Sequence, residues 1–503
     1  MTKKTILIYF AIGLFCFFLV CTAVDYDNDL FARLIVGERI VEAGIFPYHD
    51  FLSYTPTHPW YDHEWGSSII FYTTLKFLKP IGFIILQAFI MFMTIVFVVK
   101  TQKLQKHKFP TSIIFLSTFA IIYQHLNASL IRCHIFSFLF FSIVLYILEK
   151  YRKKNDKKLI WIIPLIILIW NNLHGGVVAG LGLIFMYIVG IFFEKKEYKQ
   201  LLYVLLTSLP LLIINPYGIK YLNFLFSATT MQRRYIVEWW PFYKSSLLKY
   251  YFLTAAYCII GYIIPFIKNK KIDITKTIVL TVTLFEGLAH VKLLPLSLIT
   301  VSAFCYNDFI RLLKFIRKFL KKFEKVLATA LIVISLTFIP LLSPTYPRAT
   351  WEKFPLKEVE FIKINNIKGN LASSFGLGSF VAYKLYPQNF IFIDGRYEEV
   401  YNEKEFLTLG AFEMAERGWG NIVYEYGTDI LMVNKEWEVY PKMLESTVFK
   451  LIYEGNIAGI FIKSNKVKKK YLQPNNDIDY YKKNILIPGT NFSKKTSCNN
   501  FDY

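Results

Sequence analysis

Long apolar segments recur along this chain and are separated by short polar ones. The first occupies residues 6–24 and follows a short basic start. The later apolar segments are residues 66–99, 111–127, 130–149, 158–173, 176–193, 199–215, 248–267, 274–290, 292–309 and 326–343. Most approach the roughly 17–25 residues that a helix needs to span a bilayer. The pattern predicts an all-α polytopic membrane domain of about eleven spans over residues 1–345.

The segment at residues 66–99 is too long for one simple span. It contains Lys76, Lys79 and Pro80, and proline breaks a helix because it lacks an N–H and clashes with the preceding turn. We interpret the segment as a short helix that dips into the membrane, followed by one crossing. Two full crossings would instead reverse the orientation of everything downstream.

The apolar pattern changes after residue 345. Residues 370–375, 389–393, 430–433 and 457–463 read as buried strands, and residues 378–385 and 440–446 read as helices. We therefore expect a small extracytoplasmic α/β domain over residues 346–464. The remaining residues, 465–503, are rich in Lys, Asn and Tyr and are expected to form a flexible polar tail.

The net charge of +22 is distributed in a way that argues against nucleic-acid binding. Lysine and arginine gather in alternate short loops between the apolar segments, near residues 100–108, 150–158, 195–199, 268–271 and 311–325. Cytoplasmic loops of membrane proteins carry this excess. The pattern predicts a multi-pass protein of the cell (inner) membrane, with a cytoplasmic N-terminus, a first outer loop at residues 24–65 and an extracytoplasmic C-terminal domain. The first segment lacks a signal-peptide cleavage site before Asp25 and is interpreted as an uncleaved anchor.

A short acidic cluster follows this first segment, at Asp25, Asp27 and Asp29. Carboxylates at the mouth of a membrane helix are costly and often functional. Paired carboxylates here can act as a general base or bind a hard divalent ion, although acids at a helix N-terminus are also ordinary caps. Asp27, His63 and Glu64 form a candidate metal site. Oxygen and imidazole ligands suit Mg²⁺ or Mn²⁺, with Zn²⁺ admitted by His63.

Further polar residues map to the same predicted outer face, which receives seven of the eight histidines. The candidates for binding a donor phosphate are Arg132, His174, Arg233, Arg234 and Lys292. The other candidate pocket residues are Asn172, His134, Glu238 and His290. Arginine suits phosphate because its planar fork makes two parallel hydrogen bonds. Two alternatives stay open: the histidines as interfacial residues without a functional role, and the arginine pair as contacts of lipid headgroups.

Several stretches together resemble one superfamily. The first outer loop, with "ARLIVGERIVEAGIFPYHDFLSYT" and "PWYDHEWGSSIIFY", is similar to that of GT-C superfamily glycosyltransferases. The likeness continues through "IRCHIFSFLF", "LIWNNLHGGVVAGL", "INPYGIKYL", "YIVEWW", "LAHVKLLPL", "GSFVAYKLYP" and "FIDGRYEEVY" and covers most of residues 5–463. It resembles a bacterial branch of that superfamily. Related branches often have histidine where this chain has Arg33, which puts a role for that position in doubt.

The resemblance implies transfer of a sugar from a polyprenyl-phosphate-linked donor to a glycan, lipid or protein acceptor at the outer face, with an inverting mechanism. Nucleic acid is not among the expected partners. The resemblance also implies that Asp29, with Asp27, is the catalytic carboxylate. Metal and arginine remain alternatives for neutralising the leaving phosphate.

Two other functions remain open, a transporter or flippase of lipid-linked glycans and a non-catalytic envelope-assembly protein. In the C-terminal domain, Asp394-Gly395-Arg396 closes a predicted strand. It is either an acceptor site or a structural turn pinned by an ion pair.

Overall fold

The computed structural model describes the chain except for residues 1–2, 23–25, 106–118, 124–130, 232, 234–235, 245–247, 269–271, 313, 342–352, 478–479, 482–483 and 490–503. Its internal contacts divide it into two compact units. One unit comprises Met1–Val24 and Ile84–Pro344, and the other comprises Asp25–Phe83 and Thr345–Tyr503. We describe each unit by itself.

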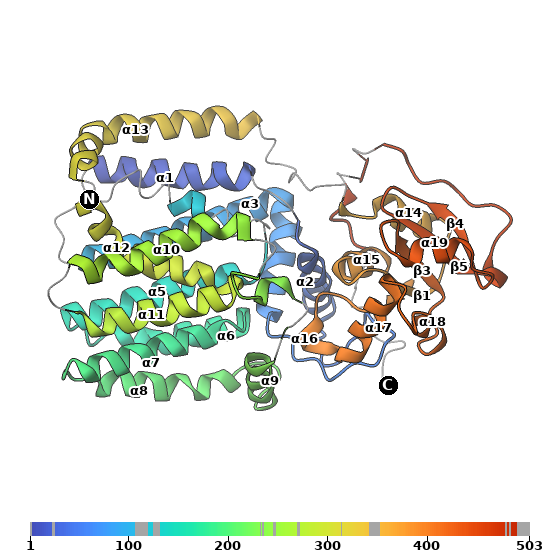
Figure 1. The fold of residues 1–503 in the computed structure, drawn as a ribbon, viewed down its shortest axis with the longest axis horizontal. Coiled ribbons are helices and arrows are strands. Elements are labelled where there is room, and N and C mark those ends of the chain that lie inside the picture. Colours follow the sequence, from blue (N-terminus) through green and yellow to red (C-terminus); the bar gives the residue numbers. More distant parts are fainter. Residues whose placement is uncertain are drawn as a thin grey trace. The chain divides into compact units, whose positions relative to one another are not determined.

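The first unit consists of helices that lie side by side (Figure 1). Helix α1 (Lys3–Thr22) packs on α13 (Lys314–Leu341), and α12 (Leu294–Leu312) packs on both α10 (Leu248–Lys268) and α11 (Ile274–Ala289). Helix α7 (Val177–Phe193) contacts α5 (His134–Lys154), α6 (Ile163–Leu173), α8 (Lys199–Ser208) and α11. The unit also contains α9 (Lys220–Thr230) and the part of α3 (Trp65–Leu104) that follows Phe83.

The surface of these helices is strongly apolar. Phe10, Phe185 and Leu253 are 56%, 58% and 76% exposed. Large exposed apolar patches are unusual on soluble monomers and mark a surface that meets lipid or a partner. Together with the apolar composition of the helices, this identifies a membrane protein.

Three helices in the described part of the chain are long and apolar enough to cross a membrane: α1, α3 (Trp65–Leu104) and α5. Shorter apolar helices occupy Leu159–Leu173, Val177–Phe193, Lys199–Ile213, Tyr251–Ile264, Val291–Cys305 and Lys325–Pro340. They coincide with the predicted apolar segments. The predicted segment 111–127 lies mostly outside the described residues, and the number and direction of the spans stay predictions.

Helix α3 is broken where the sequence indicates. Lys79 has φ 58° and ψ −166°, which is not helical, and Pro80 follows it. Proline disfavours helical backbone at the residue before it, because its ring clashes with that residue. The boundary between the two units falls just beyond, after Phe83. The expected short helix followed by a second helix is present, whereas its position in a membrane stays a prediction.

The second unit contains a five-stranded sheet in the order β2-β1-β3-β5-β4. Strands β2 (Asn389–Ile391), β1 (Gly369–Ala372) and β3 (Ile430–Asn434) are parallel, whereas β5 (Ala458–Lys463) and β4 (Phe449–Glu454) are antiparallel to their neighbours. Helix α15 (Gly378–Leu385) connects β1 to β2 as predicted, and α19 (Val439–Leu444) precedes β4. The remaining helices are α14 (Leu356–Ile364), α16 (Tyr397–Val400), α17 (Glu403–Glu413) and α18 (Asn421–Tyr424).

The first outer loop belongs to this second unit and not to the helical unit with which its position in the sequence groups it. Helix α2 (Asn28–Glu38), followed by a π-helical turn at Arg39–Ala43, packs on α15. Phe31 is fully buried there, with ring centroids 5.0 Å from Phe380 and 5.4 Å from Tyr383. Ser53 forms a parallel bridge with Ile391, so the loop also covers the β2 edge of the sheet.

The described part of the tail is not the free polar segment expected. Tyr481, Ile485 and Leu486 are buried. Tyr383 donates a hydrogen bond to the carbonyl of Leu486 at 2.5 Å, and Gly489 N donates to the carbonyl of Tyr383 at 2.8 Å. These few apolar residues anchor the tail on α15 despite the Lys- and Asn-rich composition around them.

Candidate functional site

The two carboxylates at the start of α2 have different local roles. Asp27 is the N-cap, and its Oδ1 accepts a hydrogen bond from the backbone N–H of Asp29 at 2.9 Å. This is the capping role that the sequence left open for Asp27. Asp29 lies in the first turn of the helix, and a Cβ atom placed on Gly395 would overlap its Oδ1. The candidate base therefore lies against a glycine of the C-terminal segment.

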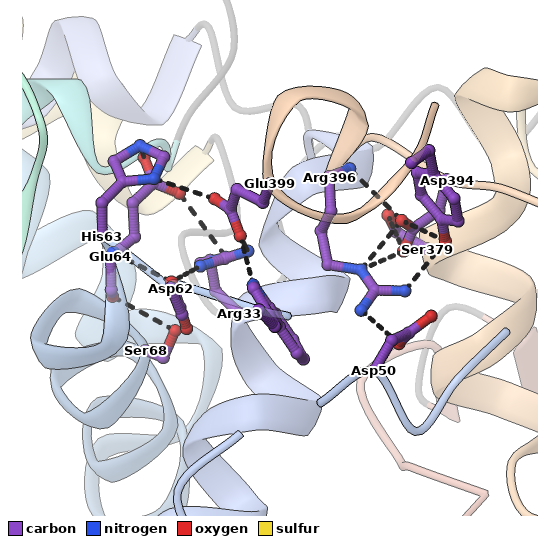
Figure 2. A network of polar contacts seen from close by, with 12 residues as sticks. Arg33, Asp50, Asp62, His63, Glu64, Ser68, Ser379, Asp394, Arg396 and Glu399 are labelled. Atoms are coloured by element: carbon purple, nitrogen blue, oxygen red, sulfur yellow. Dashed lines mark hydrogen bonds and ion pairs between the residues drawn. The ribbon is translucent and has the colours of Figure 1, made fainter. Parts of the chain in front are cut away.

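A buried ionic cluster, here called the Arg33 cluster, lies farther along the same helix (Figure 2). Its members are Arg33, Asp62, His63, Glu64 and Glu399. The Arg33 guanidinium forms its shortest ion pair with Asp62. Its nitrogens lie 3.5 Å from carboxylate oxygens of Glu64 and of Glu399. His63 lies between those two glutamates, with Nδ1 3.1 Å from Glu399 and Nε2 3.7 Å from Glu64.

The two most buried acids of this cluster differ in acidity. Burial raises the pKa of Asp62 to about 6, opposed by the charge of Arg33 and reinforced by that of Glu399. Burial also opposes ionisation of Glu399, but Arg33, His63 and the hydrogen bond from Trp60 outweigh it and lower its pKa to about 2. Glu399 is therefore the carboxylate that the cluster keeps ionised.

The residues of this cluster fit a metal ion. His63, Glu64 and Glu399 each offer a ligand atom, and these atoms lie within 4.8 Å of one another. Two of the three predicted metal ligands, His63 and Glu64, are therefore brought together. Within the part of the chain that the structure describes, Asp27 is not in this group and Glu399 takes its place.

A second buried network centres on Arg396. Its Nη1 donates to Asp50 at 2.6 Å, and its Nε donates to Asp394 at 2.9 Å. Tyr401 accepts from the same guanidinium at 3.0 Å. Arg396 is 3% exposed and its side chain is used in these contacts, so Asp394-Gly395-Arg396 has the geometry of a structural turn pinned by an ion pair.

Trp60 connects the two networks. Its ring lies 4.6 Å beneath the Arg396 guanidinium, and its Nε1 donates to Glu399 Oε2 at 2.6 Å. The residue is fully buried. Trp60 therefore fixes the carboxylate of Glu399 from the side opposite His63.

The helical unit contains a separate cationic cluster. Arg132 forms an ion pair with Glu238, whose other oxygen lies 3.8 Å from Lys292 Nζ. Burial opposes ionisation of Glu238, but the charges of Arg132 and Lys292 outweigh it and lower its pKa to about 2. Two predicted phosphate-binding residues thus gather around one predicted pocket residue.

Aromatic contacts place two more of the predicted residues beside this cluster. The Arg233 guanidinium lies 4.2 Å from the centroid of the Trp239 ring, and Lys292 Nζ lies 5.5 Å from it. His290 Nδ1 is 2.9 Å from the carbonyl oxygen of Trp239. Arg234 lies outside the described residues.

His174 has a defined tautomer. Its Nδ1 accepts a hydrogen bond from Gly176 N at 2.9 Å and lies 2.7 Å from Ser137 Oγ, which itself accepts from Trp170 Nε1. A backbone N–H can only donate, so the proton of the neutral ring is on Nε2. The neutral His174 ring can therefore donate a hydrogen bond from Nε2.

The last two predicted pocket residues have local contacts. Asn172 donates to the carbonyls of Leu168 and Ile214 at 2.9 and 3.0 Å, which ties the end of α6 to the loop after α8. The His134 ring lies 5.1 Å from that of Phe138, one turn along α5.

Sequence reasoning missed Glu399 and the bridging role of Trp60, and it left the role of Arg33 in doubt. Glu399 lies within the quoted "FIDGRYEEVY" stretch, which was the available signal.

Comparison with known proteins gives a fold but no family. No family model matches the chain, and no curated protein matches it. The chain is similar in structure to the oligosaccharyltransferase of Archaeoglobus fulgidus, solved in the apo form, with a TM-score of 0.59 and 10% identity. The superposition covers 95% of this chain and 77% of that one. This similarity shows that the chain shares the fold of that oligosaccharyltransferase.

Proposed function

We propose that this protein is a membrane glycosyltransferase of the GT-C type, which transfers a sugar from a polyprenyl-phosphate-linked donor to an acceptor at the outer face of the membrane. The observation that carries this proposal is the fold shared with an oligosaccharyltransferase over 95% of the chain. Each unit by itself carries side chains with chemistry that the reaction needs, carboxylates on α2 in one and the cationic cluster in the other.

In the proposed reaction the acceptor oxygen or nitrogen attacks the anomeric carbon of the donor. The bond from that carbon to the phosphate oxygen breaks, and the polyprenyl phosphate leaves with the electron pair. Asp29 takes the acceptor's proton. Attack from the side opposite the leaving group inverts the anomeric centre.

The leaving phosphate needs preorganised positive charge and donors. Arg132 and Lys292 supply two cations, and Arg233 a third that is held on the Trp239 ring. Since Nδ1 of His174 accepts from Gly176, His174 would contribute a hydrogen bond from Nε2 and not a full charge. Glu238 orients Arg132 and Lys292 in the absence of phosphate.

A divalent ion such as Mg²⁺ or Mn²⁺ is the alternative means of stabilising that phosphate. When bound, such an ion acts as a Lewis acid on phosphate oxygens. Its candidate ligands in this chain are His63 and Glu64 together with Glu399.

The test is donor cleavage coupled to product formation by the purified full-length protein. A panel of polyprenyl-phosphate sugars would be supplied with acceptor mixtures, and free polyprenyl phosphate and glycosylated product would be measured. Asp29→Asn preserves size and removes the base, so transfer should fall roughly 10²-fold or more. Glu403→Gln, at an exposed acid on α17, is the matched control and should behave as wild type.

Near wild-type transfer by Asp29→Asn would exclude Asp29 as the base. Movement of intact lipid-linked sugar across a vesicle membrane, with no cleavage of the donor, would favour the transporter or flippase alternative. Absence of both activities with every donor would favour an assembly protein.

A further inference from the structure

We propose that His63, Glu64 and Glu399 bind one Mn²⁺ or Zn²⁺ ion that clasps the first outer loop onto helix α16 of the C-terminal domain. This inference deepens the proposed function at the same three residues. It assigns the bound ion a structural role in the second unit, which can be tested whether or not the ion also acts on a donor phosphate.

The positions of the ligand atoms support such a site. The three candidate atoms lie within 4.8 Å of one another, and the Nδ1 of His63 is 3.1 Å from a Glu399 oxygen. Ligand atoms about 2.0–2.2 Å from a shared metal are separated by roughly 3–3.5 Å in a tetrahedral site. Small side-chain rotations would therefore complete the site. Figure 2 shows the three side chains directed toward one another.

The Arg33 cluster has more acidic than basic side chains. Three carboxylates share one guanidinium, which is closest to Asp62 and 3.5 Å from Glu64 and from Glu399. The side chains of Glu64 and Glu399 are only 18% and 4% exposed. Buried charges are costly unless they are paired or coordinate a metal. With His63 as a neutral metal ligand, one divalent ion would balance the excess negative charge of the cluster.

The surrounding residues form hydrogen bonds that orient the candidate ligands, as residues next to the ligands do in known metal sites. Trp60 donates to Oε2 of Glu399, which leaves Oε1 facing His63. Asp62 accepts from the backbone N–H of Glu64 at 2.9 Å and thereby fixes the start of α3. Hydrogen bonds of this kind hold metal ligands in place before the ion arrives.

The chemistry of the ligands selects the class of ion. Mg²⁺ prefers oxygen ligands and keeps much of its water, whereas imidazole suits Zn²⁺ and the first-row transition metals. Three protein ligands leave a coordination position for water. The guanidinium of Arg33, at 3.5 Å from both glutamates, opposes a cation and will limit the affinity.

The three candidate ligands come from two segments that are far apart in the sequence. His63 and Glu64 immediately precede α3, and Glu399 lies in α16. An ion would join these segments, which the contacts of Trp60 and Arg396 already bring together. Binding should therefore protect α16 and the loop before α3 against local opening.

A binding experiment on full-length protein in detergent tests this proposal. The protein would be stripped with a chelator and titrated with Mn²⁺, with Zn²⁺, and with Co²⁺ as a spectroscopic substitute. Bound metal, the visible absorption of Co²⁺ and hydrogen exchange of residues 60–66 and 396–401 would be measured. We expect one ion per chain and slower exchange in both segments.

The variants Glu399→Gln and His63→Ala should each weaken binding by about 10-fold or more, the scale seen when metal sites lose even an outer partner. His58→Ala is the matched control, because His58 is an exposed histidine of the same loop. If a ligand variant does not fold, protection of the wild-type segments by added metal still decides the question.

No uptake of the three metals by wild-type protein would overturn the clasp, as would equal uptake by the wild type and both ligand variants. His63 would then be better described as an imidazolium between two glutamates. Sugar transfer is assayed separately. Metal binding without transfer contradicts only the proposed function, whereas transfer without metal binding contradicts only the clasp.

Discussion

At the scale of single residues, the contacts of the Arg33 cluster join segments that lie far apart in the sequence. The acids after the first apolar segment, with His63 and Glu64, were identifiable because charge is costly at such a position. Their partners were not identifiable, because Trp60 and Glu399 are 339 residues apart and only the fold brings them together. The sequence did offer the capping role of Asp27 as an alternative, because a helix cap depends only on the neighbouring backbone.

Gly395 provides a test of the link between Asp29 and the C-terminal segment. A methyl group at this position would overlap the Asp29 carboxylate, so Gly395→Ala should displace the proposed base. We expect sugar transfer to fall roughly 10-fold or more, since a misplaced catalytic group is costly even by small distances. Thermal unfolding should change little, because the carboxylate can rotate away.

The control is Gly410→Ala, since a Cβ there meets nothing within 4 Å. It should keep full transfer. Unchanged transfer by Gly395→Ala would show that the position of Asp29 against this turn is unimportant for the reaction.

At the scale of elements, the described apolar segments of the first unit contain helices, because each apolar run is continuous. The pattern missed α9, which lies between the segments at residues 199–215 and 248–267, and the start of α13, which begins at Lys314. In the second unit the pattern located β1, β2, β3, β5 and α15. It missed β4, in which Phe449 is buried, the other residues are partly buried or exposed, and the pairing with β5 has an irregular register. Burial on one side only gives a strand a weaker apolar signal.

Helix α17 contains a carboxyl group that makes the stability of the protein depend on pH. Glu413 is its last residue, and burial raises the pKa of that carboxyl from 4.5 to about 7. The folded state therefore holds a proton that the unfolded state releases between these values, so stability falls as the pH rises from about 4.5 to about 7. A negative charge at a helix C-terminus is also unfavourable. Glu413→Gln should stabilise the protein by roughly 1–3 kcal/mol near pH 8 and by little near pH 5.

The measurement is thermal unfolding of the full-length protein at both pH values, with hydrogen exchange of residues 403–413 as the local readout. Glu403→Gln, in the first turn of the same helix, is the control and should be neutral or slightly destabilising. An equal gain at both pH values for Glu413→Gln would contradict the assigned titration.

At the scale of the whole molecule, the sequence predicted an apolar helical region and a small α/β region, and both are present. It did not predict that the first outer loop and residues 345–503 form one compact unit. That grouping depends on Phe31 packing against α15 and on Ser53 bridging to Ile391, contacts between distant segments that no local pattern encodes.

The last prediction concerns the orientation of the chain, on which every proposed role depends. Basic residues cluster in alternate loops, and such loops remain in the cytoplasm. A reporter enzyme that works only outside the cytoplasm should be active when fused after residue 464 and inactive when fused after Lys154. A reporter that works only inside should give the opposite result at both positions. Reversal of both reporters would mean either that the whole chain is inverted or that α3 crosses the membrane twice. A double crossing would put His63 and Glu399 on opposite sides of the membrane. These residues lie in one compact unit, with His63 Nδ1 3.1 Å from a Glu399 oxygen, so a double crossing is incompatible with this packing. The packing of the second unit therefore requires the first outer loop and the C-terminal domain to lie on one side of the membrane, and the charge pattern predicts that this side is the outer one.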